Sequence, residues 1–131
     1  MGLEDEKYIS FTTFKRDGTA VATAVWIVAL DGGKYGFWTG STAGKAKRLK
    51  NNPKVLMQPC DSRGRVKSGS TTTEGTAVVV VTGAEADAVR AKITAKYGFM
   101  VTVTKALRKL NNIILRKKEP YGDIAIVITP A

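Results

Sequence analysis

Closely spaced turn residues divide the first 40 residues into short β-favouring segments. Residues 8–14 are rich in β-branched and aromatic side chains, and Asp17-Gly18 follows as a turn of the kind that joins antiparallel strands. Residues 19–30 form a long β-favouring segment, closed by Asp31-Gly32-Gly33 before another such segment at 34–39. Two successive hairpins of this kind predict an antiparallel meander.

Three later segments extend this pattern of strands. Residues 54–59 predict a further strand, and residues 76–82 contain enough valine to predict a strand buried on both faces. Residues 123–129 predict a closing strand whose alternation favours the edge or seam of the sheet. The polar, basic residues 61–70 predict a loop.

Helical patterns interrupt the strands at three places. Residues 43–50 predict a short basic helix capped by Thr42, and 84–97 predict a helix that ends at Gly98. Residues 104–118 predict an amphipathic, strongly basic helix. Because the helices are inserted and do not alternate strictly with strands, we predict a β-dominated α+β fold, an antiparallel split β-barrel with peripheral helices. The length of 131 residues predicts a single domain, residues 1–131.

The composition excludes several kinds of catalytic site. The chain has no histidine and one cysteine, Cys60, so serine triads, cysteine–histidine pairs and histidine-zinc sites are excluded. We expect Cys60 to be a small packing residue. The acidic N-terminus differs from a secretory signal and no 18 apolar residues run together, which predicts a soluble, cytoplasmic protein.

The chain is strongly basic, with a formal net charge of +10. Such a surplus favours an anionic partner: nucleic acid, a membrane surface or a phosphorylated ligand. Residues 37–53 combine a strand with a short basic helix, and small residues at the helix start let an anion approach Lys45. Backbone N–H groups, the helix dipole and a lysine at one point suit a phosphate. The alternative is a solvated basic helix on the surface.

Residues 37–53 resemble the phosphate-binding strand and helix of the pyridoxamine 5′-phosphate oxidase-like split-barrel family. Thr39, Lys45, Asn52 and Pro53 match the pattern of that family. Upstream, residues 11–19 and 23–27 resemble its opening hairpin, whose second strand lies along the ring of a flavin or deazaflavin. The resemblance covers most of residues 8–97, and it implies a homodimer with the cofactor groove near the subunit interface.

Departures from the family pattern point to one branch of it. Thr23 and Val28 stand about where its oxidases carry an arginine and a lysine, and Ala43-Gly44 replaces a Ser-Arg pair. The chain is more similar to the branch that uses the deazaflavin coenzyme F420, which bears a phosphate and an oligoglutamate tail and is more anionic than FMN. We therefore expect an F420-dependent oxidoreductase that transfers a hydride to or from an organic acceptor, with FMN as the alternative cofactor.

The resemblance implies a set of cofactor-binding residues. Val25 and Trp26 would line the ring; Lys45, Lys47 and Arg48 would hold the phosphate; Arg63 and the segment around Arg108 and Lys109 would reach the tail or a substrate. The full set is Val25, Trp26, Thr39, Ser41, Thr42, Gly44, Lys45, Lys47, Arg48 and Arg63. We expect Trp38 to be a core residue and Tyr97 to end a buried stripe. No residue is marked as a general acid.

Two further questions concern partners. A basic β-barrel that binds nucleic acid is the alternative from another class of protein, but Phe11, Trp26, Phe37 and Trp38 lie in apolar strands, unlike exposed stacking platforms. The segment 104–118 has three interpretations: it binds the cofactor tail, it packs on the barrel or a partner subunit, or it lies on an anionic membrane to meet a lipophilic, quinone-like substrate.

Overall fold

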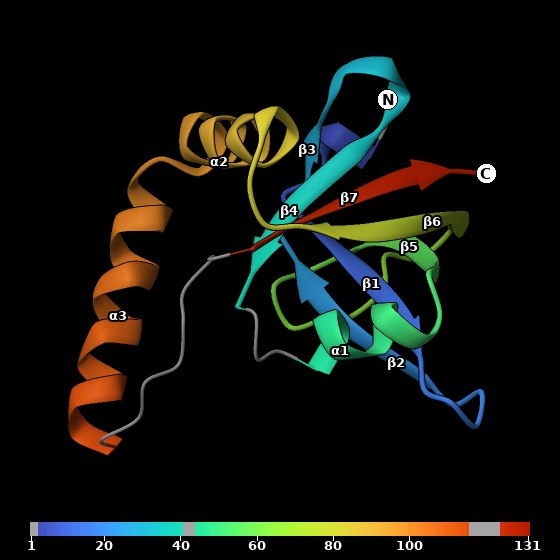
Figure 1. The fold of residues 1–131 in the computed structure, drawn as a ribbon, viewed down its shortest axis with the longest axis horizontal. Coiled ribbons are helices and arrows are strands. Elements are labelled where there is room, and N and C mark those ends of the chain that lie inside the picture. The colour runs from blue at the N-terminus through green and yellow to red at the C-terminus, as the bar shows by residue number, and fades with distance from the viewer. Residues whose placement is uncertain (1–2, 41–43, 116–123) are drawn as a thin grey trace.

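Seven antiparallel strands form one curled sheet in the computed structural model of the chain, which describes residues 3–40, 44–115 and 124–131 (Figure 1). The strands are β1 (Tyr8–Phe14), β2 (Ala20–Val25), β3 (Val28–Ala29), β4 (Tyr35–Thr39), β5 (Lys54–Cys60), β6 (Thr73–Val80) and β7 (Ile124–Pro130). The helices are α1 (Gly44–Asn51), α2 (Ala84–Tyr97) and α3 (Phe99–Leu115), with 3₁₀ turns at Leu3–Asp5 and Asp31–Gly33. The predicted β-dominated α+β split barrel is confirmed.

The order of the strands explains the curl of the sheet. The order is β2-β1-β5-β6-β7-β4-β3, so β2 and β3 lie at opposite edges. Only Trp26 and Ile27 separate these two strands in the chain. The sheet must therefore curl until its edges meet, and Trp26-Ile27 forms the seam. The prediction of one continuous strand over residues 19–30 is wrong at this point, because the chain changes partner from β1 to β4 there.

The core lies inside the curl and beneath α2. Phe11 and Phe37 are fully buried and meet edge to face, with 4.8 Å between ring centroids. Helix α2 packs Val89, Ile93 and Tyr97 against this core. Gly36 on β4 makes the close approach possible, because a Cβ there would lie 2.7 Å from Cγ2 of Val89. The close packing of α2 on the sheet therefore requires a glycine at this position of β4.

Two strand predictions are corrected by the structure. Strand β6 alternates between buried and exposed residues, so it is not buried on both faces; Ala77 is buried, whereas the side chain of Val78 is 55% exposed. Valine favours the strand conformation on the outward face of β6 as well as packing on its inward face. Strand β7 is no edge, because it pairs with β6 on one side and β4 on the other, and residues 124–128 are all buried.

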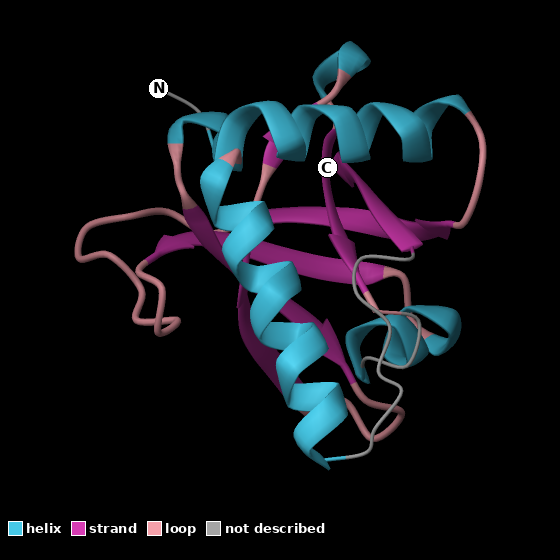
Figure 2. Ribbon diagram, turned by 90° about the vertical axis from the view of Figure 1, so that its left-hand side faces the viewer, coloured by secondary structure: helices cyan, strands magenta, loops and turns pink. Residues whose placement is uncertain are grey.

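The helices match their predictions in two cases and differ in one. Helix α2 has the predicted bounds and ends at Gly98. Helix α1 is described from Gly44 to Asn51, one residue past its predicted end, and its predicted first residue, Ala43, lies outside the described residues. Helix α3 begins at Phe99, five residues earlier than predicted, because Gly98 alone breaks the chain between two helices. In Figure 2, α3 descends from the end of α2 and crosses in front of the strands. Residues 116–118, predicted to continue it, and the proposed cap Thr42 lie outside the described residues.

Candidate functional site

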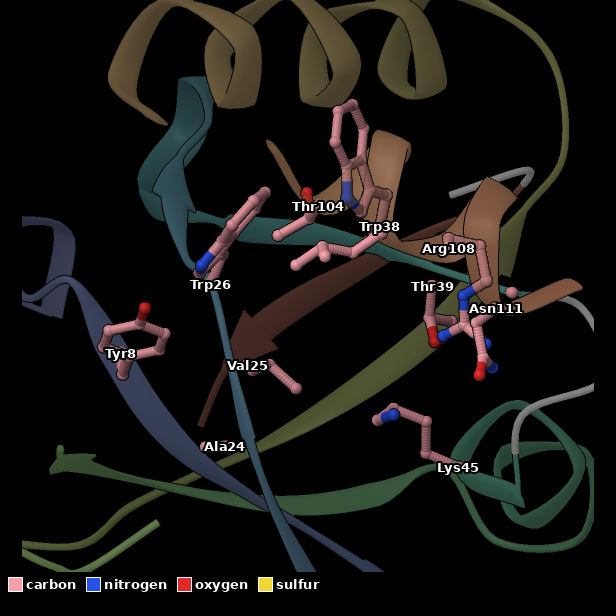
Figure 3. Close-up of a pocket in the computed structure, with 12 residues that line it drawn as sticks. Tyr8, Ala24, Val25, Trp26, Trp38, Thr39, Lys45, Thr104, Arg108 and Asn111 are labelled. Atoms are coloured by element: carbon pink, nitrogen blue, oxygen red, sulfur yellow. The ribbon is translucent and has the colours of Figure 1, made fainter. Parts of the chain in front are cut away.

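A pocket of about 520 Å³ lies beside the seam, where β1, β2, β4, α1 and α3 converge (Figure 3). This volume is within the range of small-molecule and cofactor sites. Its lining residues are Tyr8, Ala24, Val25, Trp26, Trp38, Thr39, Gly40, Lys45, Thr104, Leu107, Arg108 and Asn111. Strands β1 and β4 and the seam supply the aromatic part of the wall, and the two helices supply the cations.

The aromatic part of the pocket is built around Trp26. The Trp26 ring stacks on Tyr97 of α2, with 4.5 Å between centroids and 11° between planes. The ring of Trp38 of β4 also lies near Trp26, with 6.2 Å between centroids and 47° between planes. Trp38 is only partly buried and lines the pocket, so the expectation of a plain core residue is too simple. These rings offer an apolar surface that suits a planar ligand.

The cationic part of the pocket combines side chains from two helices. Lys45, in the first turn of α1, and Arg108 of α3 both line it, next to Thr39 at the end of β4 (Figure 3). Burial, together with the neighbouring Arg48, lowers the pKa of Lys45 below its usual 10.5. Burial deprives the Lys45 ammonium of part of its hydration, and a bound anionic ligand would stabilise the charged form in its place.

Four of the ten predicted cofactor residues line this pocket: Val25, Trp26, Thr39 and Lys45. Ser41 and Thr42 lie outside the described residues. Gly44, Lys47, Arg48 and Arg63 are not among the residues that line it. Lys47 is exposed on the surface of α1, and Arg63 is exposed in the loop after β5, where its backbone N–H donates to Asp61 Oδ1 at 2.9 Å.

Arg48 has a structural position that the sequence did not reveal. Its Nε donates a hydrogen bond to Oγ1 of Thr13 at 2.6 Å, and Thr13 is fully buried in β1. The guanidinium also folds over Gly44, where an added Cβ would lie 2.7 Å from Nη1 of Arg48. Gly44 and Arg48 therefore join α1 to the sheet and place Lys45, although neither lines the pocket.

Several lining residues were missed from the sequence. Ala24 and Gly40 adjoin predicted residues, whereas Tyr8 comes from β1 and Thr104, Leu107 and Asn111 come from α3. Of the α3 residues, Arg108 had been expected to reach a ligand. The shared spacing of Thr104, Leu107, Arg108 and Asn111 on one side of a helix was a usable signal, but nothing in the sequence aims that side at the seam.

Cys60 fits its predicted role as a packing residue. It is buried, and burial together with the nearby Asp61 carboxylate raises the pKa of its thiol, which disfavours a reactive thiolate. Within the described ranges, no cluster of three or more histidine, cysteine, aspartate or glutamate residues could hold a metal. In the same residues, no helix is both long and apolar enough to cross a bilayer.

Comparison with known proteins agrees with this geometry. A family model described as pyridoxamine 5′-phosphate oxidase matches residues 2–119. The chain belongs to the pyridoxamine 5′-phosphate oxidase family. No curated protein is similar enough in sequence to count as a relative. The matched residues include every strand and helix that lines the pocket.

Solved structures with the same fold include members with different names. HutZ, the heme storage protein from Vibrio cholerae, has a TM-score of 0.66 at 16% identity, over 97% of this chain and 83% of that one. HupZ from Group A Streptococcus has a TM-score of 0.65 at 11% identity, over 100% and 90%. An F420 reductase has a TM-score of 0.60 at 20% identity, over 98% and 90%. At these identities the similarity shows the fold alone.

Proposed function

We propose that this family member binds the deazaflavin coenzyme F420 in the pocket at the seam and acts as an oxidoreductase on an organic acceptor. One observation carries the proposal: a single pocket joins an aromatic wall, Trp26 and Trp38, to a cationic wall, Lys45 and Arg108. A ring system with a charged tail needs both walls. The family's fold accommodates flavin-type cofactors, and one solved structure of the same fold is an F420 reductase.

The lining residues fit such a cofactor by their chemistry. Trp26 and Trp38 would hold the ring and exclude water from one side of it. Lys45 would hold the phosphate, and Arg108 would meet a second anionic group in the direction of α3. When bound, the cofactor supplies the hydride, so the chain needs only to position the reactants. Tyr8 lines the pocket on the side of Trp26 and is our candidate for delivering a proton to the acceptor.

FMN is the second candidate cofactor, and F420 is favoured by charge. The pocket wall contains two cations from separate helices, and the chain as a whole has a net charge of +10. A cofactor with a phosphate and an oligoglutamate tail uses both cations, whereas a single phosphate needs one. Heme is disfavoured for a different reason: the chain has no histidine, the ligand of heme iron in globins and peroxidases, and the described residues that line the pocket offer only Tyr8 in its place.

The proposal includes an assembly and a location. We expect a homodimer in the cytoplasm, and Val78 and Val81 support the dimer because these large apolar side chains are more than half exposed, at 55% and 57%. Nucleic acid is not expected as a partner, since Phe11 and Phe37 are buried and cannot stack on bases. Analytical ultracentrifugation measures the oligomeric state, and a monomer would contradict the proposed homodimer.

The experiment that tests the cofactor is a parallel titration. Oxidised F420, FMN and hemin are added separately to the protein, and quenching of tryptophan fluorescence reports binding because Trp26 and Trp38 line the pocket. We expect F420 to bind most tightly, and we expect reduced F420, supplied separately together with an organic acceptor, to be oxidised as its hydride passes to that acceptor. Tighter binding of FMN would replace F420 by the alternative cofactor, and tight binding of hemin alone would overturn the oxidoreductase proposal.

A further inference from the structure

Helix α3 has an apolar face that no described residue covers. Phe99, Val103, Leu107, Leu110 and Ile113 recur at helical spacing and are all exposed, from 38% for Val103 to 80% for Phe99. The opposite face contains the buried Val101 and the pocket residues Thr104 and Arg108. The apolar residues therefore form a continuous stripe, the α3 stripe, that the other described residues leave exposed. Figure 1 shows α3 at one side of the molecule, outside the curled sheet.

The charge around the α3 stripe has one sign. From Phe99 to Lys118 the sequence contains six cations and no aspartate or glutamate. Lys105 and Lys109 are exposed on α3 itself, and Arg116, Lys117 and Lys118 follow α3 in the sequence, outside the described residues. An apolar stripe with purely basic surroundings is typical of helices that lie in the interface of an anionic membrane.

We propose that α3 docks this protein on the surface of an anionic lipid bilayer, with the α3 stripe inserted among the acyl chains and Lys105 and Lys109 near the headgroups. A second copy of the chain is the other possible occupant. Packing one α3 against another would bring two sets of cations together without a compensating carboxylate from either helix. Charge complementarity therefore favours lipid.

Leu107 connects the membrane surface to the pocket. Its side chain belongs to the α3 stripe and is also one of the residues that line the pocket. With the stripe in the interface, the mouth of the pocket beside α3 opens toward the bilayer. An apolar acceptor dissolved in lipid would then reach the cofactor without crossing water; this last step rests on the proposed function, whereas docking itself does not.

Vesicle co-sedimentation of the intact protein tests the proposal. We use vesicles of phosphatidylglycerol and phosphatidylcholine and compare them with vesicles of phosphatidylcholine alone. The test variant is Leu110→Asp/Ile113→Asp, whose sites are exposed and do not line the pocket. The matched control is Ala91→Asp/Ala95→Asp, which makes the same charge change at exposed sites on α2.

We expect binding to the anionic vesicles alone, weakened by salt. The α3 variant should lose at least about tenfold in partition coefficient, because each aspartate replaces an apolar side chain that inserts into the bilayer, while the α2 control should bind as wild type. Equal binding by the α3 variant, or no binding by wild type, would overturn the proposal. If wild type does not bind vesicles, and the α3 variant is a smaller oligomer than wild type, the α3 stripe would be assigned to contact with a second copy of the chain. Cofactor titration of the α3 variant reports the pocket separately.

Discussion

The ring of Tyr97 lies flat against the ring of Trp26, with 4.5 Å between their centroids. The Tyr97 hydroxyl also accepts a hydrogen bond from the N–H of Ile27 at 2.9 Å and lies 2.7 Å from the carbonyl oxygen of Lys7, to which it donates. Lys96 donates to the Ile27 carbonyl at 2.7 Å. The last turn of α2 thus satisfies backbone groups at the seam that have no strand partner, and it fixes Trp26 in the pocket wall.

Tyr97→Phe should destabilise the protein while keeping the ring stack. The variant leaves the buried Ile27 N–H without its acceptor, which costs about 1–3 kcal/mol of unfolding free energy. Urea unfolding measures this loss. The control is Thr94→Ala, which removes an exposed hydroxyl that bonds only within α2. If Tyr97→Phe were as stable as wild type, Tyr97 would not hold the seam.

The same hydroxyl gives the stability a dependence on alkaline pH. Burial raises the pKa of Tyr97 from 10.0 to about 12. Because the folded protein retains the phenol proton longer than the unfolded chain, this contribution is complete below pH 10.0 and is lost as the pH rises toward 12. Unfolding free energies measured across this window should fall more steeply for wild type than for Tyr97→Phe. Parallel curves would contradict the assignment.

Arg48→Ala should lower the free energy of unfolding of the free protein, because Arg48 contacts the sheet and does not line the pocket. It removes the donor to the fully buried Thr13 hydroxyl, at an expected cost of about 1–3 kcal/mol. A double-mutant cycle with Thr13→Val measures the pair, and we expect the two losses to be less than additive. Lys47→Ala, one position away and exposed, is the control and should change stability by less than about 0.5 kcal/mol. Strict additivity in the cycle would show that the contact contributes nothing.

Lys45 should make the binding of an anionic cofactor depend on pH. Its pKa in the free protein lies below 10.5, mainly through burial, so the ammonium loses its proton at lower pH than an exposed lysine. Cofactor affinity should be highest below that pKa and should fall as the pH rises through it. The unfolded chain keeps this proton up to pH 10.5, so the free protein should gain stability across the same window. In Lys45→Met, cofactor affinity and unfolding free energy should both depend less on pH across this window. Lys47→Met is the control.

The fold was predictable largely because local signals agreed with the final structure. Asp17-Gly18 and Asp31-Gly32-Gly33 mark real turns, and the periodicity of 84–97 gives α2 its bounds. The break at Trp26-Ile27 was not predictable, since both residues favour strands and the break arises from long-range closure of the sheet. Strand β7 looked like an edge for the same reason: its two neighbours come from distant parts of the chain.

The site was predictable where family resemblance and local chemistry coincided. Lys45 and Trp26 line the pocket, and so do their neighbours Thr39 and Val25. Arg48 looked equivalent to Lys45 in sequence, because both are cations on one short helix. Only the fold shows that Arg48 turns back to Thr13, whereas Lys45 enters the pocket. The contribution of α3 depends on how Gly98 redirects the chain, which spacing alone does not determine.

The dissociation constant of F420 for wild type, Lys45→Ala and Lys47→Ala is the most direct measurement of the central claim. Lys45 lines the pocket and Lys47 does not, although both lie in α1 and carry the same charge. Loss of a charge-assisted contact predicts that Lys45→Ala weakens binding roughly 10- to 150-fold, with Lys47→Ala within about twofold of wild type. Unchanged affinity in Lys45→Ala, or an equal loss in both variants, would contradict a cofactor site at the seam.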